Sequence, residues 1–213
     1  MQNRYTADIG DYGKLGLLRC LEKTGLKIGV NWYLTPDEGH NEDGRFIQYA
    51  HDEAYQPYDP PLWRALAQIL ESGQRRVTAL ESPRILKATF FGELLDCSEV
   101  PASRRPDLRT AWHRRALKAL RGCQLVFADP DNGLMVPSAL HSKQSDKYVL
   151  PEELFAFYRQ GASVLYYQHK ARRPDDFYLD QHRRLVQALP KAQGLGLKFT
   201  RTSLRYYWFL LQP

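Results

Sequence analysis

The sequence predicts an α/β domain: a Rossmann-like, mostly parallel sheet with helices on both faces and a C-terminal antiparallel hairpin. Short apolar stretches typical of strands alternate with longer amphipathic stretches typical of helices. This alternation is typical of parallel sheets covered by helices. The last two apolar stretches, 197–203 and 205–211, follow one another almost directly, so we expect them to pair as a hairpin.

The length and composition are those of one globular domain. The chain has 213 residues, of which 43% are hydrophobic and 25% charged. Chains divide into several domains mainly above about 250–300 residues, so we expect a single domain over residues 1–213. The sequence has no apolar run of about 20 residues, which predicts no membrane-spanning helix. Residues 1–5 lack the apolar core of a signal peptide.

The cysteines and the charge indicate the compartment and a class of partner. Cys20, Cys97 and Cys123 are an odd, widely spaced set, which fits neither a disulfide framework nor a zinc cluster. Such a set is typical of the reducing cytoplasm, where we expect the protein to reside. The net charge of +6 suits a nucleic acid or nucleotide partner. Seven cations gather around one predicted helix and would suit a phosphate backbone, whereas most such runs of charge are solvated faces: Arg104, Arg105, Arg109, Arg114, Arg115, Lys118 and Arg121.

The first half of the chain contains capped helices and short strands. Asp11 and Asp59 are residue types that cap helices, and Pro60 and Pro61 suit a first helical turn. The elements expected here are a helix over 11–22, a strand over 27–34, a helix after Asp59, and strands over 77–81 and 88–91.

The second half continues the alternation. Gly122 is a typical helix end, and proline followed by acids, as at Pro151 and Pro174, is a typical helix start. The elements expected here are a helix over 107–121, a strand over 124–129, a helix from Pro151, a strand over 162–168, a helix from Pro174 and the final hairpin.

The stretch from Val126 to Gly133 is the strongest candidate for a site. Its apolar part predicts a buried strand, and the Pro-Asp-Asn-Gly that follows predicts a turn. Ligands of open α/β sheets bind just beyond the carboxyl ends of the strands. We therefore expect Asp129, Asp131 and Asn132 to be catalytic residues.

Polar residues follow the other predicted strands as well. Asp37, Glu38 and His40 follow the first strand, Glu81 ends the second, and His169 with Lys170 ends a later one. Gathered at one sheet edge, they would bind ribose hydroxyls, hold a metal or move protons. The alternative is structural, since loops are polar and acids often cap the helices that follow strands.

The segment from Asp8 to Lys14 combines two acids, glycines and a lysine at a predicted helix start. Glycines let a ligand approach the backbone, helix starts favour anions, and Lys14 adds a positive charge. An ordinary capped helix is the alternative. The phosphate loop of nucleoside-triphosphate hydrolases is absent from the sequence.

Two segments and the order of the elements resemble a bacterial family, the large-subunit rRNA adenine-N6 methyltransferases. The stretch Thr6-Ala-Asp-Ile-Gly-Asp-Tyr-Gly-Lys14-Leu-Gly resembles that family's opening His-Ala-Gly-Asn-x-x-Asp-x-x-Lys-His, with Asp11 and Lys14 at the matching spacing. Asp129-Pro-Asp-Asn132 stands where the family has Asp-Pro-Pro-Tyr. The resemblance implies a class I methyltransferase fold, S-adenosylmethionine near Lys14 and the first strand, and the target amine near Asp129.

The sequence departs from that family at two places. The glycine-rich turn after the first strand is replaced by the long acidic segment 35–44. Asn132 replaces the aromatic residue that stacks on the flipped base in such enzymes, which argues against adenine as the target. The chain also resembles bacterial and phage proteins that share the Gly-Asp-x-Gly-Lys and Asp-Pro-Asp-Asn-Gly elements, and no activity comes with that resemblance.

Three classes of function follow. The first is a methyltransferase-like enzyme acting on nucleic acid or a nucleotide, in which Asp11 and Lys14 hold S-adenosylmethionine, Glu81 binds its ribose and Asp129 orients the acceptor. The second is a nuclease or phosphohydrolase that uses Mg or Mn; its candidate ligands are Asp37, Glu38, His40, Asp129, Asp131 and His169. The third is a non-catalytic Rossmann-like binding protein.

Overall fold

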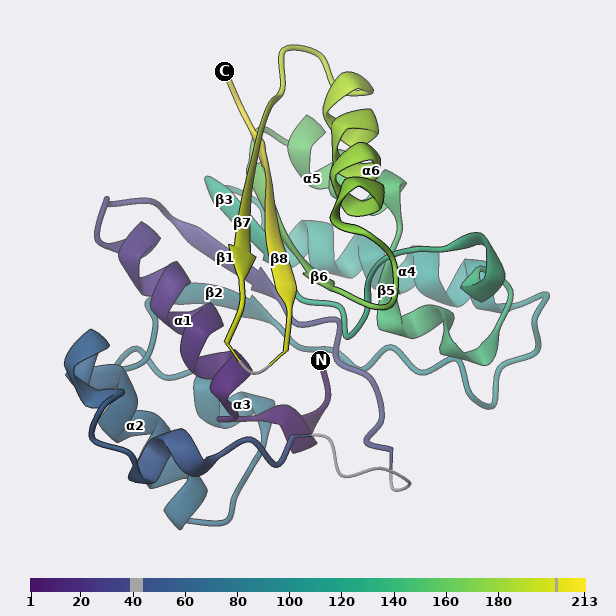
Figure 1. The fold of residues 1–213 in the computed structure, drawn as a ribbon. Helices are drawn as coiled ribbons and strands as arrows, with labels where there is room; N and C mark the ends of the chain where they lie inside the picture. The colour runs from purple at the N-terminus through teal and green to yellow at the C-terminus, as the bar shows by residue number, and fades with distance from the viewer. Residues whose placement is uncertain (39–43, 202) are drawn as a thin grey trace. The chain divides into compact units, whose positions relative to one another are not determined.

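The computed structural model describes residues 1–38, 44–201 and 203–213, and it confirms the α/β class (Figure 1). The chain divides into two compact units. The sheet unit comprises Met1, Gly29–Thr35 and Thr89–Pro213, and the helical unit comprises Gln2–Ile28 and Pro36–Ala88. The expectation of a single domain stays a prediction.

A six-stranded sheet in the order β2-β1-β3-β6-β8-β7 forms the framework. Its strands are β1 (Ile28–Asn31), β2 (Ala88–Phe91), β3 (Leu125–Ala128), β6 (Ser163–His169), β7 (Gln193–Phe199) and β8 (Arg205–Leu211). β3 and β6 are parallel, whereas β8 is antiparallel to both of its neighbours. The predicted hairpin is therefore confirmed, but its first strand is Gln193–Phe199 and not 197–203. β8 lies inside the sheet between β6 and β7.

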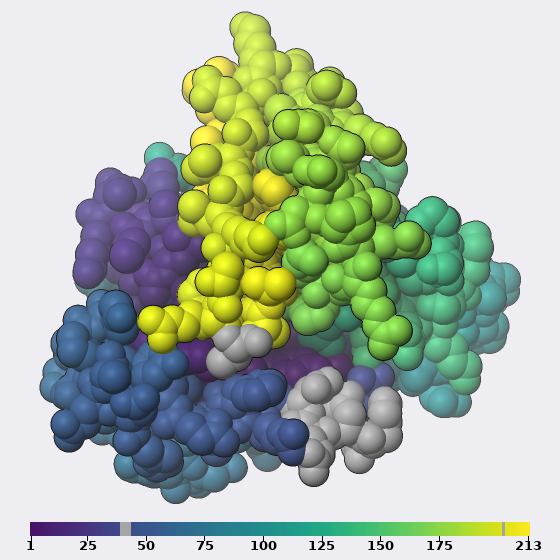
Figure 2. Space-filling view, viewed as in Figure 1, coloured from purple at the N-terminus to yellow at the C-terminus, as the bar shows by residue number. Residues whose placement is uncertain are grey.

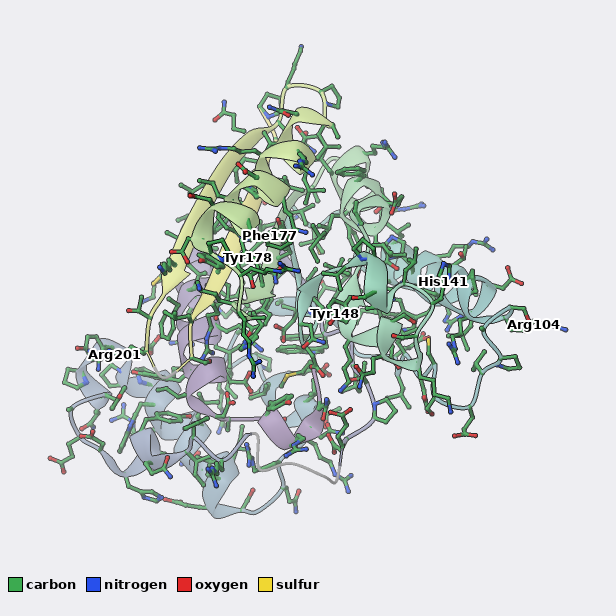
Figure 3. The ribbon with its side chains drawn as sticks, turned by 45° about the vertical axis from the view of Figure 1, so that its right-hand side comes forward. Arg104, His141, Tyr148, Phe177, Tyr178 and Arg201 are labelled. Atoms are coloured by element: carbon green, nitrogen blue, oxygen red, sulfur yellow. The ribbon has the colours of Figure 1, made fainter. Side chains whose placement is uncertain are left out.

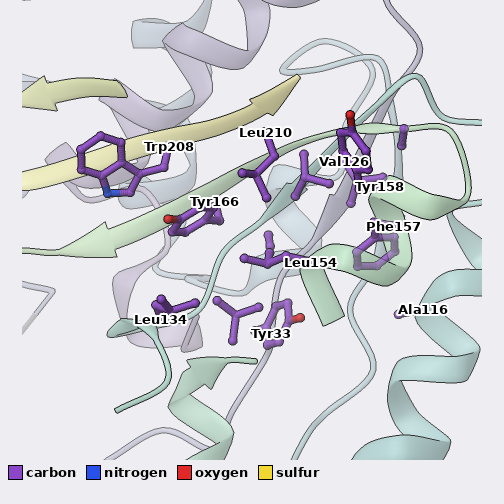
Figure 4. Close-up of a cluster of buried hydrophobic side chains, with 14 of the residues drawn as sticks. Tyr33, Ala116, Val126, Leu134, Leu154, Phe157, Tyr158, Tyr166, Trp208 and Leu210 are labelled. Atoms are coloured by element: carbon purple, nitrogen blue, oxygen red, sulfur yellow. The ribbon is translucent and has the colours of Figure 1, made fainter. Parts of the chain in front are cut away.

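Three helices of the sheet unit share one core with one face of the sheet. They are α4 (Arg105–Ala119), α5 (Pro151–Arg159) and α6 (Asp175–Gln187). Val126, Val164 and Leu210 occupy matching register positions and belong to this core. Figure 4 labels Val126 and Leu210 in it. Phe127 and Leu165, which alternate with them along the strands, are also fully buried. Burial on both faces explains why β3 and the centre of β6 are apolar runs.

A second, two-stranded parallel sheet lies beyond β3. It pairs β4 (Gly133–Leu134) with β5 (Tyr148–Val149). Two 3-10 helices, η4 (Pro137–Ala139) and η5 (Lys143–Lys147), lie between these strands in the chain. β4 follows the predicted turn directly, so this small sheet fixes where the turn ends.

The helical unit contains α1 (Ile9–Glu22), α2 (Pro60–Glu71) and α3 (Val77–Leu80), with 3-10 helices η1 (Asn3–Tyr5), η2 (Gln48–His51) and η3 (Gln56–Tyr58). The predicted cap of α2 is confirmed, because the Asp59 carboxylate accepts from Leu62 N. The same carboxylate pairs with Arg19 Nε of α1 at 2.6 Å. Asp59 therefore caps one helix and joins it to another.

Two local predictions are wrong. Residues 77–80 form the helix α3, not a strand, because Val77 and Leu80 are both buried at the i, i+3 spacing of one helix face. Glu81 consequently follows a helix, and its prediction as the end of a strand is wrong. The cap of α1 is Asp8, whose carboxylate accepts from Asp11 N at 3.0 Å, so Asp11 lies inside the first turn. No described helix is long and apolar enough to cross a membrane.

Candidate functional site at the end of β3

The turn after β3 is held at both ends by backbone hydrogen bonds. Asp129 N donates to Asn31 O of β1 at 2.9 Å, which continues the contact between the two strands. At the other end, Asn132 N donates to Lys147 O at 3.0 Å, just before β5 begins. The Asp129 residue is 2% exposed. The acidic turn is therefore a fixed part of the sheet edge.

Gln168 of β6 clamps this turn from the neighbouring strand. Its amide oxygen accepts from Leu134 N at 2.8 Å, and its amide nitrogen donates to Asn132 O at 3.0 Å. Gly133 lies under this amide with φ +107, and a Cβ there would overlap the Gln168 carboxamide. Sequence reasoning missed Gln168, although a polar residue inside an apolar strand was a usable signal.

The amino group of Met1 occupies the centre of the turn. It lies 2.6 Å from Asp131 Oδ1 and donates to Tyr33 O at 2.9 Å and to Asp129 O at 3.2 Å. The Asp131 side chain is 7% exposed, and the Thr35 hydroxyl donates to its other oxygen at 3.4 Å. Asp131 is thus a buried counter-ion of an ammonium group.

His169 meets the turn through its backbone. His169 N donates to Asn132 O at 3.2 Å. The structure therefore brings together four of the predicted site residues, Asp129, Asp131, Asn132 and His169, at the carboxyl ends of β3 and β6. This placement is the one expected for the site of an open α/β sheet.

The comparisons with known proteins do not assign this site. No protein-family model matches the chain, and no curated protein sequence matches it.

In the helical unit, Asp11 and Lys14 are bound to each other. Lys14 Nζ donates to Asp11 Oδ1 at 2.9 Å, and Ala7 N donates to Asp11 Oδ2 at 2.9 Å. Both side chains are at least nine-tenths buried. Ala7 has φ +61, so the Asp11 carboxylate also stabilises an unusual backbone turn before α1. This arrangement fits a structural ion pair.

The other predicted acids of the helical unit make local contacts. Asp37 Oδ1 accepts from Arg4 N at 3.1 Å. Glu38 N donates to the Gln2 side chain at 3.2 Å, and the Arg4 guanidinium donates to Glu38 O. His40 lies outside the described residues. Within 1–38, 44–201 and 203–213, no group of three or more His, Cys, Asp or Glu side chains is arranged to hold a metal ion.

Sequence reasoning did not predict the buried ion pair between Arg109 and Glu153 in the sheet unit. Arg109 Nε and Nη2 contact the two carboxylate oxygens of Glu153 at 2.6 Å and 2.8 Å, and Tyr33 OH donates to Glu153 at 3.1 Å. Burial raises the pKa of Tyr33, and the Glu153 carboxylate adds to the rise. Burial alone would lower the pKa of Arg109, but Glu153 raises it. Arg109, predicted as one cation of a basic surface, is therefore buried, and that prediction is wrong.

The exposed cations of α4 lie near its C-terminal end. A basic pocket of about 370 Å³ there is lined by Arg114, Arg115, Leu117, Lys118, Arg121 and Gln160. Arg115 also pairs with Glu93 at 2.5 Å. Because α4 leads directly into the start of β3, this pocket lies toward the amino end of that strand, opposite the Asp129 turn.

Proposed function

We propose that the protein is an S-adenosylmethionine-dependent, methyltransferase-like enzyme that acts on a nucleic acid or nucleotide. The observation that supports this most strongly is the sheet, in which parallel strands are followed by β8 inserted antiparallel between β6 and β7. A mostly parallel sheet with such a terminal pair is the outline of a class I methyltransferase domain. The turn with Asp129 lies at the edge where ligands of open α/β sheets bind.

Asp129 is the residue we propose to orient the acceptor group. A carboxylate accepts hydrogen bonds from an amine or hydroxyl, and a buried one imposes direction on its partner. Met1, Asn31 and Gln168 hold the backbone of the turn. Catalysis by this site would rest on positioning the acceptor and excluding water from it.

S-adenosylmethionine, when bound, supplies an electrophilic methyl group. The segment predicted to hold it does not fit this role in the observed arrangement, because Asp11 and Lys14 neutralise each other. Glu81 follows the helix α3 and not a strand. Its predicted contact to the ribose depended on a position at a strand end. The observed arrangement therefore does not support donor binding by Asp11, Lys14 and Glu81.

The hydrolase alternative has less support from the side chains. Asp131, one of its predicted ligands, is the counter-ion of the Met1 ammonium. The described residues also bring no three metal-binding side chains together. The alternative of a non-catalytic binding protein predicts no turnover of any kind. The methyl-transfer and cleavage assays described below would then both be negative.

The test is donor binding by calorimetry, followed by transfer of a labelled methyl group to RNA and DNA. We expect Asp129→Asn to keep donor binding and to lower methyl transfer by about 100-fold, the cost of misplacing the acceptor by about 1 Å. Asp107→Asn, an exposed Asp of α4, is the matched control and should transfer at the normal rate. Folded protein that binds no donor at millimolar concentration would contradict the proposal. Magnesium-dependent cleavage of nucleic acid, lost in Asp129→Asn, would support the hydrolase instead.

A further inference from the structure

The loop that follows β6 continues the sheet edge away from the Asp129 turn. His169 N is bonded to Asn132 O of that turn at 3.2 Å. The next residue, Lys170, donates its backbone N–H to Leu204 O at 3.1 Å. The loop 170–174 therefore begins one residue after the contact between β6 and the turn.

This loop carries more positive than negative charge. Arg172 and Arg173 are exposed, and so are all residues from 171 to 177. The nearby Asp175 is engaged by two cations: Lys170 Nζ lies 3.4 Å from it, and Lys198 Nζ forms a shorter ion pair with it. The Lys198 ammonium lowers the pKa of Asp175 to about 2. Asp176 is exposed as well, so four cations, Lys170, Arg172, Arg173 and Lys198, stand against two acids and leave this surface with a net positive charge.

An exposed aromatic ring stands beside these arginines. Phe177 in the first turn of α6 is 37% exposed, and the Arg173 guanidinium lies 5.5 Å from its ring centroid. Figure 3 labels Phe177 together with its neighbour Tyr178. The Tyr178 hydroxyl accepts from Ala171 N at 2.8 Å, which holds the loop against the helix. In the space-filling view, α6 (light green) and β7 (yellow) adjoin on the visible surface (Figure 2).

We propose that Arg172, Arg173 and Phe177 bind single-stranded nucleic acid and lead it to the Asp129 turn. Guanidinium groups bind phosphates, and an exposed ring stacks on a base whatever its identity. A base in a duplex is already stacked on its neighbours, so the ring favours an unpaired strand. The inference rests on the proposed function in one respect: it takes the bound single-stranded nucleic acid to be the substrate of the enzyme.

The first experiment measures the affinity of the protein for a fluorescent 12-nucleotide single strand, as RNA and as DNA, by anisotropy without methyl donor. Arg172→Gln with Arg173→Gln should weaken binding about tenfold. It should also lower the slope of log affinity against log salt by about 1.4, since each phosphate contact on a single strand contributes about 0.7. The matched control is Arg114→Gln with Lys118→Gln, which removes equal charge from the basic pocket of α4.

The second experiment removes the ring. Phe177→Leu should weaken binding about tenfold with an unchanged salt slope, because stacking releases no counter-ions. Tyr58→Leu is the control, since Tyr58 is 72% exposed and lies in the helical unit. Thermal unfolding of each variant checks that the fold is intact.

Three results would overturn the proposal: no binding by the wild-type protein at 50 mM salt, equal weakening by a variant and its control, or tighter binding of a duplex. Because these assays contain no methyl donor, their outcome is independent of donor binding. Normal binding of single-stranded nucleic acid without binding of the methyl donor would contradict only the proposed function. Binding of the methyl donor without binding of single-stranded nucleic acid at this loop would contradict only the inference.

Discussion

At the scale of single residues, Gly133 decides whether the Asp129 turn can close. Its positive φ and the Gln168 amide above it leave no room for a side chain. The amide in turn satisfies two backbone groups of the turn. Because Gly133 has no Cβ, the buried Gln168 side chain of β6 can approach the turn and fix its geometry.

We expect Gly133→Ala to destabilise the protein by about 2–5 kcal/mol. Backbone strain accounts for about 1–2 kcal/mol, and displacing the Gln168 amide leaves buried groups unbonded at about 1–3 kcal/mol. Urea unfolding measures the loss. Gly122→Ala is the matched control, because Gly122 has φ +82 and no atom lies within 4 Å of the position that its new methyl group would take. Equal losses in the two variants would show that the Gln168 clamp contributes nothing.

His182 makes stability depend on pH. It stacks on Trp208 with ring centroids 4.6 Å apart, and its Nδ1 lies 3.2 Å from Tyr166 OH. Burial lowers its pKa to about 4, below the ordinary value of about 6.5 in an unfolded chain. Between these values the unfolded chain binds a proton that the folded protein does not.

Stability should therefore fall as the pH falls from about 6.5 to 4, by up to about 1.4 kcal/mol per pH unit from this residue. His182→Gln removes the titrating group, so its unfolding free energy should fall less steeply across that window. His51→Gln, at an exposed position, is the control. A wild-type slope no steeper than that of His182→Gln would contradict a neutral, buried imidazole.

At the scale of elements, the sequence predicts helices and strands correctly where the pattern of apolar residues and the capping residues agree. The helix after Asp59 begins where its cap and prolines predict, and β3 is a strand with both faces buried. The wrong prediction was the strand over 77–81, where the structure has the helix α3 (Val77–Leu80). Four residues do not separate a period of two from a period of 3.6.

The start of α1 gives a prediction that separates a structural role from donor binding. Asp11→Ala leaves the buried Lys14 ammonium without its carboxylate, which should cost about 3–5 kcal/mol. Asp11→Ala with Lys14→Met removes both charges and should recover part of this loss. Denaturant unfolding of both single variants and the double variant measures the coupling. Additive losses would contradict a structural pair and make these residues candidates for ligand binding again.

At the scale of the whole molecule, the sheet edge was predictable from the sequence but the contacts within it were not. Asp129, Asp131 and Asn132 follow the carboxyl end of β3, as predicted, and their catalytic role stays a prediction. The partner of Asp131 is the amino group of Met1, and the clamp comes from Gln168. Pairings over such distances in the chain depend on the assembled sheet, and no local pattern carries them.

The rates at which a reagent labels the three cysteine thiols measure how well the fold protects them from solvent. Cys20 is exposed, whereas Cys97 and Cys123 of the sheet unit are buried, and all three are thiols that form no disulfide. Burial also raises the pKa of the Cys97 thiol, which lowers its reactive thiolate fraction. We expect a thiol reagent to label one cysteine quickly in the native protein and all three in urea. Cys20→Ser should abolish the fast phase.

The two slow thiols then report how often the sheet unit opens. Cys123 Sγ lies 3.0 Å from where a Cβ on Gly29 of β1 would stand, so this thiol is packed against the sheet beside the strand that contacts Asp129. Reagent can reach it only when that packing is lost. Gly133→Ala should therefore speed its labelling, if the turn and the sheet open together. Slow labelling that is unchanged in Gly133→Ala, despite a lower unfolding free energy, would mean that the turn opens independently of the strands it joins.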